Sequence, residues 1–209
     1  AERSNRFAHA MRALTGDDPA NVALLIGNRV ETVETDIGLI KAGLGRVSIN
    51  PRLAPDEIAY ILGNSEARVL VYDPRYRDAL DGWNDPQTTL VALDDLGVRG
   101  YESLLGSASA KTARYVRGRD EPSLIMYTSG TTGRPKGAVW TFASRAEAVR
   151  NMLLNELDSN AARVMAHVGS VSHGSGSKIV PVYLRGGRSL LLGRFDPSEF
   201  LQLVRRERV

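Results

Sequence analysis

Residues 127–138 combine glycines, hydroxyl side chains and cations in a spacing that suits phosphate binding. The segment reads Tyr-Thr-Ser-Gly-Thr-Thr-Gly-Arg-Pro-Lys-Gly-Ala. Glycines permit positive φ angles and close backbone approach, so the backbone N–H groups of such a turn can point at one anion. The hydroxyl groups add hydrogen-bond donors, and Arg134 and Lys136 add positive charge. The segment therefore predicts a loop able to hold a triphosphate, with a plain surface loop as the alternative.

Several better-known loops do not fit this chain. A Walker A loop is excluded because Pro135 precedes Lys136 and the Gly-Lys-Ser/Thr ending is missing. Gly43-Leu-Gly45 resembles the start of a dinucleotide-binding fingerprint, but Ser48 stands where its third glycine belongs. The sequence also has no Gly-x-Ser-x-Gly and no His-Glu-x-x-His segment, so serine hydrolase and zinc protease chemistry lose their main support.

Apolar runs that alternate with helical patterns must position the loop. Such alternation predicts an α/β fold with parallel sheet and right-handed crossovers. The expected strands are 22–27, 47–49, 67–72, 88–93, 123–127, 163–168 and 189–192. The expected helices are 33–44, one opening at 55, 143–157, 179–184 and one capped by Asp196.

The pattern weakens between residues 94 and 122, which read as a connection with one short helix. We therefore expect a first α/β segment at 1–93, the connection at 94–122, and a second α/β segment at 123–209 that carries the loop. The two segments are expected to form two related layers of sheet.

Composition narrows the classes of function. With no cysteine, disulfide frameworks, zinc–thiolate sites and cysteine nucleophiles are excluded. The 27 basic and 24 acidic residues nearly balance, and the arginines are scattered rather than clustered, so nucleic acid is not an expected partner. No apolar run reaches the roughly 20 residues of a membrane span, and the start lacks the pattern of a signal peptide. We expect a cytoplasmic location.

Ten consecutive residues, 128–137, resemble the signature phosphate loop of the adenylate-forming superfamily, which includes acyl-CoA synthetases, adenylation domains of peptide synthetases and luciferases. Residues 41–60, with Asn50-Pro51-Arg52, are similar to the upstream helix-strand-helix of the same family and closest to its AMP-forming acyl-CoA synthetase branch. His173-Gly174 occupies the place where the family has a His at the wall of the acyl pocket. Ser172 departs from the bulky residue that the family usually has there.

The resemblance implies parallel-sheet, helix-covered subdomains of the family's N-terminal domain, in an incomplete set. It implies that ATP activates a carboxylic acid, fatty or otherwise, to an acyl-adenylate, from which coenzyme A takes the acyl group. The implied phosphate-binding residues are Thr128, Ser129, Gly130, Thr131, Thr132, Gly133 and Lys136. Thr132 is the implied protein contact for the Mg²⁺ that accompanies ATP, and His173 and Gly174 line the implied acyl pocket.

Other segments of the family's active site, including the adenine-binding segment and the catalytic lysine of a mobile C-terminal domain, are expected beyond Val209. We therefore expect a fragment with negligible ligase activity by itself, and no catalytic residue is assigned within it. An exposed apolar face at the truncation would favour a homo-oligomer. Two alternatives stay open at this point: an adenylating enzyme whose acceptor is a carrier-protein thiol, and a noncatalytic nucleotide-binding or interaction module. His173 likewise has an alternative role as a helix N-terminal residue without a ligand.

Overall fold

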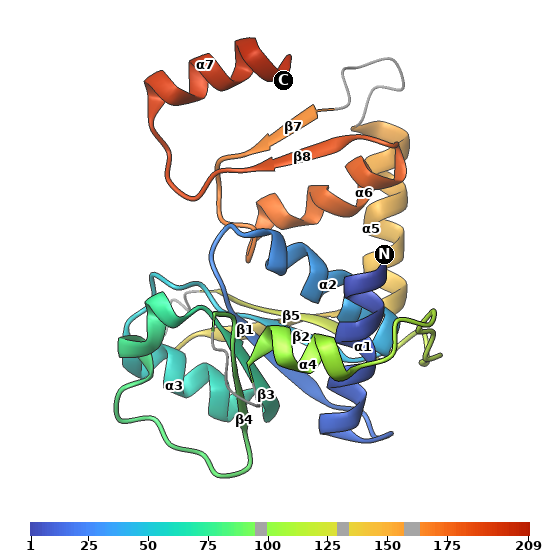
Figure 1. Ribbon diagram of the computed structural model, residues 1–209, viewed down its shortest axis with the longest axis vertical. Helices are drawn as coiled ribbons and strands as arrows, with labels where there is room; N and C mark the ends of the chain where they lie inside the picture. Colours follow the sequence, from blue (N-terminus) through green and yellow to red (C-terminus); the bar gives the residue numbers. More distant parts are fainter. Residues whose placement is uncertain (95–99, 129–133, 157–163) are drawn as a thin grey trace.

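The computed structural model describes residues 1–94, 100–128, 134–156 and 164–209, which form a six-stranded sheet, a separate two-stranded sheet and the helices that cover them (Figure 1). The strands are β1 (Asn21–Leu25), β2 (Gly45–Ser48), β3 (Ala67–Tyr72), β4 (Thr89–Ala92), β5 (Pro122–Thr128), β6 (Lys136–Thr141), β7 (Val164–His167) and β8 (Arg188–Leu191). The helices are α1 (Glu2–Thr15), α2 (Val30–Ala42), α3 (Pro55–Asn64), α4 (Tyr101–Ser107), α5 (Phe142–Asn155), α6 (Ile179–Leu184) and α7 (Pro197–Glu207), with short 3-10 turns η1 (Pro74–Leu80) and η2 (Gly174–Lys178).

The large sheet has the strand order β4-β3-β1-β2-β5-β6, and β7 pairs with β8 in the small one. Every pair is parallel except β5 with β6, so the predicted α/β fold with parallel sheet is confirmed and one antiparallel edge strand is added to it. Strand β6 and helix α1 were not expected from the sequence. All the strands and helices that were expected are present, with ends shifted by a few residues. Part of the expected helix 143–157 lies outside the described residues.

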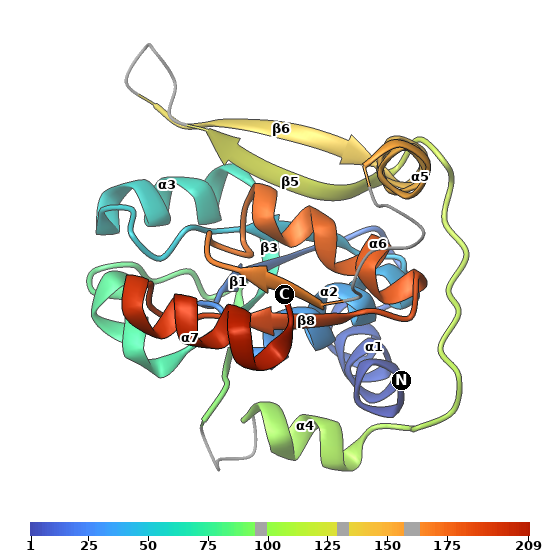
Figure 2. The same cartoon turned by 90° about the horizontal axis from the view of Figure 1, so that it is seen from above.

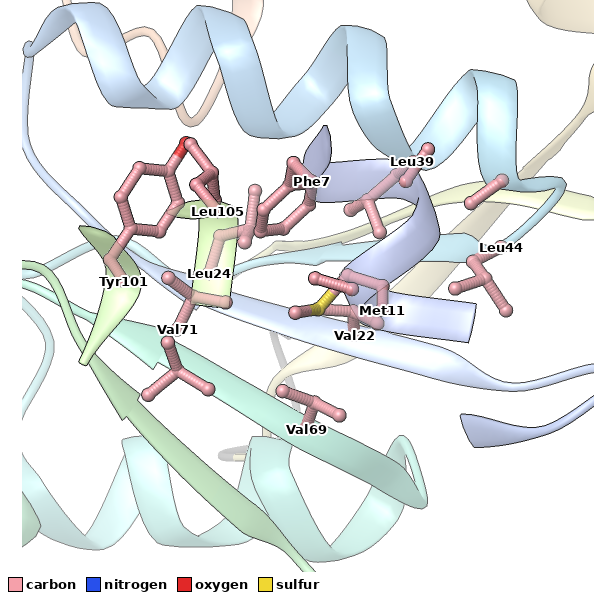
Figure 3. Packing of buried hydrophobic residues seen from close by; sticks show 14 of the residues in the cluster. Phe7, Met11, Val22, Leu24, Leu39, Leu44, Val69, Val71, Tyr101 and Leu105 are labelled. Atoms are coloured by element: carbon pink, nitrogen blue, oxygen red, sulfur yellow. The ribbon is translucent and has the colours of Figure 1, made fainter. Parts of the chain in front are cut away.

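Two apolar cores lie on opposite faces of the large sheet because alternate residues of each strand point to opposite sides. On one face α1, α2 and α4 cover a cluster in which Phe7, Met11, Leu24 and Tyr101 are buried (Figure 3). On the other face α3 covers a second cluster. Full burial of a large apolar side chain contributes about 1.5–3 kcal/mol, so these two cores hold the sheet and its helices together.

Local signals in the sequence explain where several helices begin and end. Gly43 ends α2 in the left-handed conformation, with φ of 62°, as its position after the apolar pattern predicted. At the start of α3, Glu57 accepts a hydrogen bond from the Ala54 N–H at 3.0 Å. Asp196 caps α7 by accepting a 2.9 Å hydrogen bond from the Glu199 N–H. These contacts define the end of α2 and the starts of α3 and α7.

Strands β5 and β6 join the same sheet as β1–β4, because β5 pairs with β2. The expectation that each segment forms its own layer of sheet is therefore wrong, because the large sheet contains strands from both sides of the 94–122 connection. This connection runs from α4 along one side of the molecule to β5 (Figure 2). Helices α2 and α6 lie between the large sheet and the β7–β8 pair (Figure 1). Within the described ranges, no helix is both long enough and apolar enough to cross a membrane.

Candidate functional site

One face of strands β2, β5 and β6 carries three cross-strand rows of side chains. In the first row Leu124 pairs with Arg46 on one side and with Trp140 on the other. The second row is Ser48, Met126 and Ala138, and the third is the pair Thr128 and Lys136. Successive rows are two residues apart along each strand, so about 13 Å separates the first row from the third. This face is therefore a track that leads from Arg46 to Thr128 and Lys136.

Thr128 and Lys136 are the two ends of the predicted phosphate loop, and both are exposed. Their pairing closes β5 and β6 into an antiparallel ribbon, so both ends of the predicted loop lie at the same end of the track. The remaining predicted phosphate-binding residues lie outside the described residues. They are Ser129, Gly130, Thr131, Thr132, which was also the predicted Mg²⁺ contact, and Gly133.

Helix α3 contacts both ends of this loop. On the β5 side, the Tyr127 hydroxyl donates a 2.7 Å hydrogen bond to Asn64 Oδ1. On the β6 side, the Arg134 guanidinium lies over the Tyr60 ring, 5.4 Å from its centroid. A cation over an aromatic face is attracted by about 0.5–1 kcal/mol at exposed sites. Buried Pro135 follows Arg134 directly. Both stems of the loop are thus held against the same helix.

An apolar cavity of about 180 Å³ opens over the first two rows of the track, between β5 and helix α5. His173 and Gly174, which were predicted to line an acyl pocket, both line this cavity. Met152 and Val149 of α5 and Val180 of α6 form much of its apolar wall. A buried cavity of about 150 Å³ accommodates a benzene molecule, so this one has room for a single ring or a short chain.

The segment that carries His173 is held by contacts from distant parts of the chain. Asn28, which follows β1, accepts a 2.9 Å hydrogen bond from the Val171 N–H and donates to the carbonyl oxygens of Gly169 and Leu192. Arg46 donates to the Val171 carbonyl at 3.3 Å. The His173 N–H then closes a turn onto the Ser170 carbonyl at 3.2 Å. His173 therefore lies at the end of a turn held by hydrogen bonds, immediately before η2.

His167, at the end of β7, is buried beneath this turn. Its Nδ1 lies 3.1 Å from both the carbonyl and the hydroxyl oxygen of Ser175, and its Nε2 lies 3.0 Å from the Ser189 hydroxyl. Burial lowers the pKa of the His167 ring, and the hydrogen bond to Ser175 opposes that shift only in part. The neutral ring can donate through one nitrogen and accept through the other, so both ring nitrogens have partners within the fold.

A buried ion cluster lies beside the cavity. The Asp36 carboxylate of α2 is 2.9 Å from Arg46 Nη1 and 2.6 Å from Arg145 Nη2. Burial alone would raise the pKa of Asp36, but the guanidiniums of Arg145 and Arg46 outweigh it and lower the pKa to about 2. Asp36 is therefore ionised at neutral pH, and the cluster of two guanidiniums and one carboxylate carries a net positive charge.

Comparison with known proteins identifies the family to which this arrangement belongs. A family model described as AMP-binding enzyme matches residues 1–209. The chain belongs to the AMP-binding enzyme family. Among its relatives is the long-chain-fatty-acid–CoA ligase FadD13 of Mycobacterium tuberculosis, 32% identical over 220 residues that cover 99% of this chain and 41% of FadD13. A feruloyl-CoA synthase of an Amycolatopsis species is 31% identical over 210 residues, which cover 100% of this chain and 41% of that protein.

The fold of this AMP-binding chain matches solved structures as well. The inhibitor-bound crystal structure of the N-terminal domain of FACL13 from Mycobacterium tuberculosis aligns with a TM-score of 0.86 and 30% identity. The alignment covers 100% of this chain and 52% of that one. The chain therefore has the fold of an N-terminal domain of adenylate-forming enzymes, and it spans 41% of the length of the curated relatives described above.

Sequence reasoning did not single out Asp36, Arg46, Arg145 or Asn28 in this AMP-binding chain. Asp36 falls on the buried side of α2, between Thr35 and Leu39, and Arg46 stands inside the strand that follows this helix. Charged residues at such positions indicate a buried ion pair, because an unpaired charge there would be costly. The sequence contained that signal for Asp36 and Arg46. Arg145 is far away in the sequence and comes to lie beside them only when the chain folds.

Proposed function

We propose that this chain supplies the triphosphate-binding loop and part of the acyl pocket of an ATP-dependent acid–thiol ligase. In the first half-reaction, an oxygen of the substrate carboxylate attacks the α-phosphorus of ATP. The bond to the bridging oxygen breaks and pyrophosphate leaves, giving an acyl-adenylate. In the second, the sulfur of coenzyme A attacks the acyl carbon, the thiol proton is lost, and AMP leaves as the thioester forms.

The single observation that carries the proposal is the track on the sheet face. It joins an apolar cavity at one end to the ends of the phosphate loop, Thr128 and Lys136, at the other. An acid bound along this track has its carboxylate toward the phosphates and its apolar part over Met126 and Leu124. This arrangement brings the attacking oxygen and the α-phosphorus together, which is the main contribution a protein makes to phosphoryl and nucleotidyl transfer.

The loop residues stabilise charge on the leaving pyrophosphate. Negative charge grows on the β and γ phosphates as the bond breaks, so donors aimed at those oxygens lower the transition state more than the ground state. In this proposal Thr128 donates its hydroxyl and Lys136 supplies a point charge from the opposite strand. The loop residues between them contribute hydroxyl and backbone N–H donors; they are Ser129, Gly130, Thr131, Thr132 and Gly133.

Mg²⁺ bound to the phosphate oxygens would neutralise part of the same charge. Thr132 is the proposed protein contact for that ion. Across the described ranges, no group of three or more His, Asp and Glu side chains is arranged to hold a metal ion by itself.

Coenzyme A is the proposed acceptor of the acyl group, because the relatives' names all include CoA although they name different acids. They name a long-chain fatty acid, a feruloyl group and indoleacetate, and each relative is a CoA ligase or synthase. Use of ATP and coenzyme A agrees with the expected cytoplasmic location. A carrier-protein thiol as acceptor would instead give turnover with a phosphopantetheinylated carrier and none with coenzyme A.

The experiment that tests the proposal is pyrophosphate exchange into ATP by the complete enzyme, with a panel of fatty and aromatic acids. We expect acid-dependent exchange, followed by thioester formation when coenzyme A is added. Lys136→Met should raise the KM for ATP and lower kcat, because the lost charge acts on the leaving pyrophosphate. Lys111→Met, an exposed lysine outside the track, serves as the matched control. Absence of exchange with every acid would refute the proposed activity.

A further inference from the structure

The end of the cavity away from the phosphate loop carries uncompensated positive charge. Arg46 and Arg145 both line the cavity, and both contact the single carboxylate of Asp36. No Asp or Glu is found among the described residues that line the cavity. A buried charge is costly unless it is paired, and here two guanidiniums share one anion. The excess charge borders an otherwise apolar space.

Hydrogen-bond donors in the same place lack protein acceptors. Arg46 Nε and Arg145 Nη1 are buried, and within the described part of the chain neither has a hydrogen-bond partner. The Ser48 hydroxyl, in the next row of the track, is likewise buried and without a partner. The Arg46 side chain is only 6% exposed, so bulk water does not satisfy it. Asp36 Oδ1, 2.9 Å from Arg46 Nη1, is the one acceptor of this cluster that also lacks a hydrogen-bond partner among the described residues. Buried polar groups in native proteins are almost always hydrogen-bonded, and the three donors call for a further acceptor.

The direction of the track indicates which part of a bound substrate would contact the unpartnered donors of Arg46 and Arg145. Arg46 and Leu124 share the first row, and the pair Thr128 and Lys136 is the third, about 13 Å away. An acid whose carboxylate reacts beside the phosphate loop therefore directs its far end toward Arg46. Helix α5, which closes the cavity, places Arg145 at the same end of the cavity as Arg46.

We propose that Arg46 and Arg145 select acids that carry an oxygen acceptor, most favourably a second carboxylate, at the end far from the reacting carboxyl group. This inference rests on the function proposed above and names the class of its acyl substrate. The far oxygen accepts hydrogen bonds from the guanidiniums and balances the net charge of the cluster. The apolar wall between the two ends, formed by Met152 and Val149, holds the connecting chain or ring.

The test compares matched pairs of acids with the complete enzyme. Hexanoate, octanoate and decanoate are each compared with the dicarboxylate of the same length, and 3-phenylpropanoate with its para-carboxylate. The readout is kcat/KM for pyrophosphate release. We expect a preference of about tenfold or more for the terminal carboxylate in at least one pair, as is typical of hydrogen bonds to charged groups.

Arg46→Met and Arg145→Met should each reduce that preference by about tenfold, because each removes a donor and one positive charge. Arg150→Met is the matched control, since Arg150 lies on the same helix as Arg145 but is 70% exposed. It should leave the preference intact. Circular dichroism and the melting temperature of each variant separate a loss of selectivity from a loss of fold.

The outcomes separate this inference from the proposed function. If no acid of any kind is activated, the ligase function itself is refuted. If acids are activated but no pair favours the terminal carboxylate, the function stands and the assignment of Arg46 and Arg145 is wrong. The assignment is also wrong if a preference exists and survives both substitutions in folded protein.

Discussion

Asp36 and Arg145 form a 2.6 Å ion pair across 109 residues of sequence. The contact ties α5, which closes the cavity, to α2 of the large core. Arg46 of β2 lies against the second oxygen of the same carboxylate. One buried side chain thus joins the sheet, a core helix and the helix over the candidate site.

Replacement of Asp36 by alanine should therefore destabilise the protein strongly. It leaves the guanidiniums of Arg46 and Arg145 without their counter-charge, and removing one partner of a buried ion pair costs about 3–5 kcal/mol. Arg145 retains 15% exposure, so we expect the lower end of that range, about 3 kcal/mol, in urea denaturation. Glu147→Ala removes an exposed partner of Arg150 from α5 and should change stability by less than about 1 kcal/mol. Equal effects of the two substitutions would contradict the role given to Asp36.

The sequence predicted the repeating elements of this fold because their signals are local. A continuous apolar run marked β1 and a β-branched run marked β3, while Gly43 and Asp196 marked the ends of helices by their own chemistry. Strand β6 was not predicted because its apolar run, Ala138 to Trp140, is short and directly follows the glycine-rich segment. Helix α1 was not predicted because the charged residues at its start make the apolar pattern of Phe7 and Met11 difficult to recognise in the sequence.

In the candidate site, too, contiguous motifs could be predicted from the sequence, whereas contacts between distant residues could not. The loop at 128–137 is a contiguous pattern and His173-Gly174 is a pair of adjacent residues, so the sequence alone could propose both. The ion cluster of Asp36, Arg46 and Arg145 depends on α5 crossing the sheet beside α2, which no short stretch of sequence encodes. Asn28 was missed for the same reason, since its partners lie more than a hundred residues away.

Gly176 should tolerate no side chain. A Cβ there would overlap the Val171 carbonyl oxygen, which also accepts the hydrogen bond from Arg46. Gly176→Ala must push the turn that carries His173 away from the sheet, and overpacking of this kind costs about 1–3 kcal/mol. We expect a lower melting temperature and a higher KM for the acid substrate. Gly193→Ala, where a Cβ meets nothing within 4 Å, is the control for stability. A Gly176→Ala protein as stable as this control would refute the predicted clash.

Stability should fall as the pH drops through the range in which His167 takes up a proton. Burial lowers the pKa of folded His167 below the value of about 6.5 in an unfolded chain. Between those two values the unfolded chain binds more protons, so the free energy of unfolding decreases as the pH falls below about 6.5. His167→Gln removes the titrating group and should flatten this part of the profile. Denaturant titrations of both proteins from pH 8 to pH 5 measure the difference, which we expect to narrow toward low pH. A difference independent of pH would mean that His167 does not titrate as described.

Tyr60 should influence ATP binding although it is placed outside the loop. Its ring lies 5.4 Å from the Arg134 guanidinium and so restrains the stem of the proposed phosphate loop next to Lys136. Loss of a contact worth about 0.5–1 kcal/mol should raise the KM for ATP of the complete enzyme about two- to fivefold in Tyr60→Leu. Tyr76→Leu is the matched control, because Arg75 lies 5.7 Å from the Tyr76 ring in a contact of the same kind on η1. Tyr60→Phe keeps the aromatic face and should restore most of the affinity. An unchanged KM for ATP in Tyr60→Leu, or an equal rise in Tyr76→Leu, would show that the stem of the loop does not depend on α3.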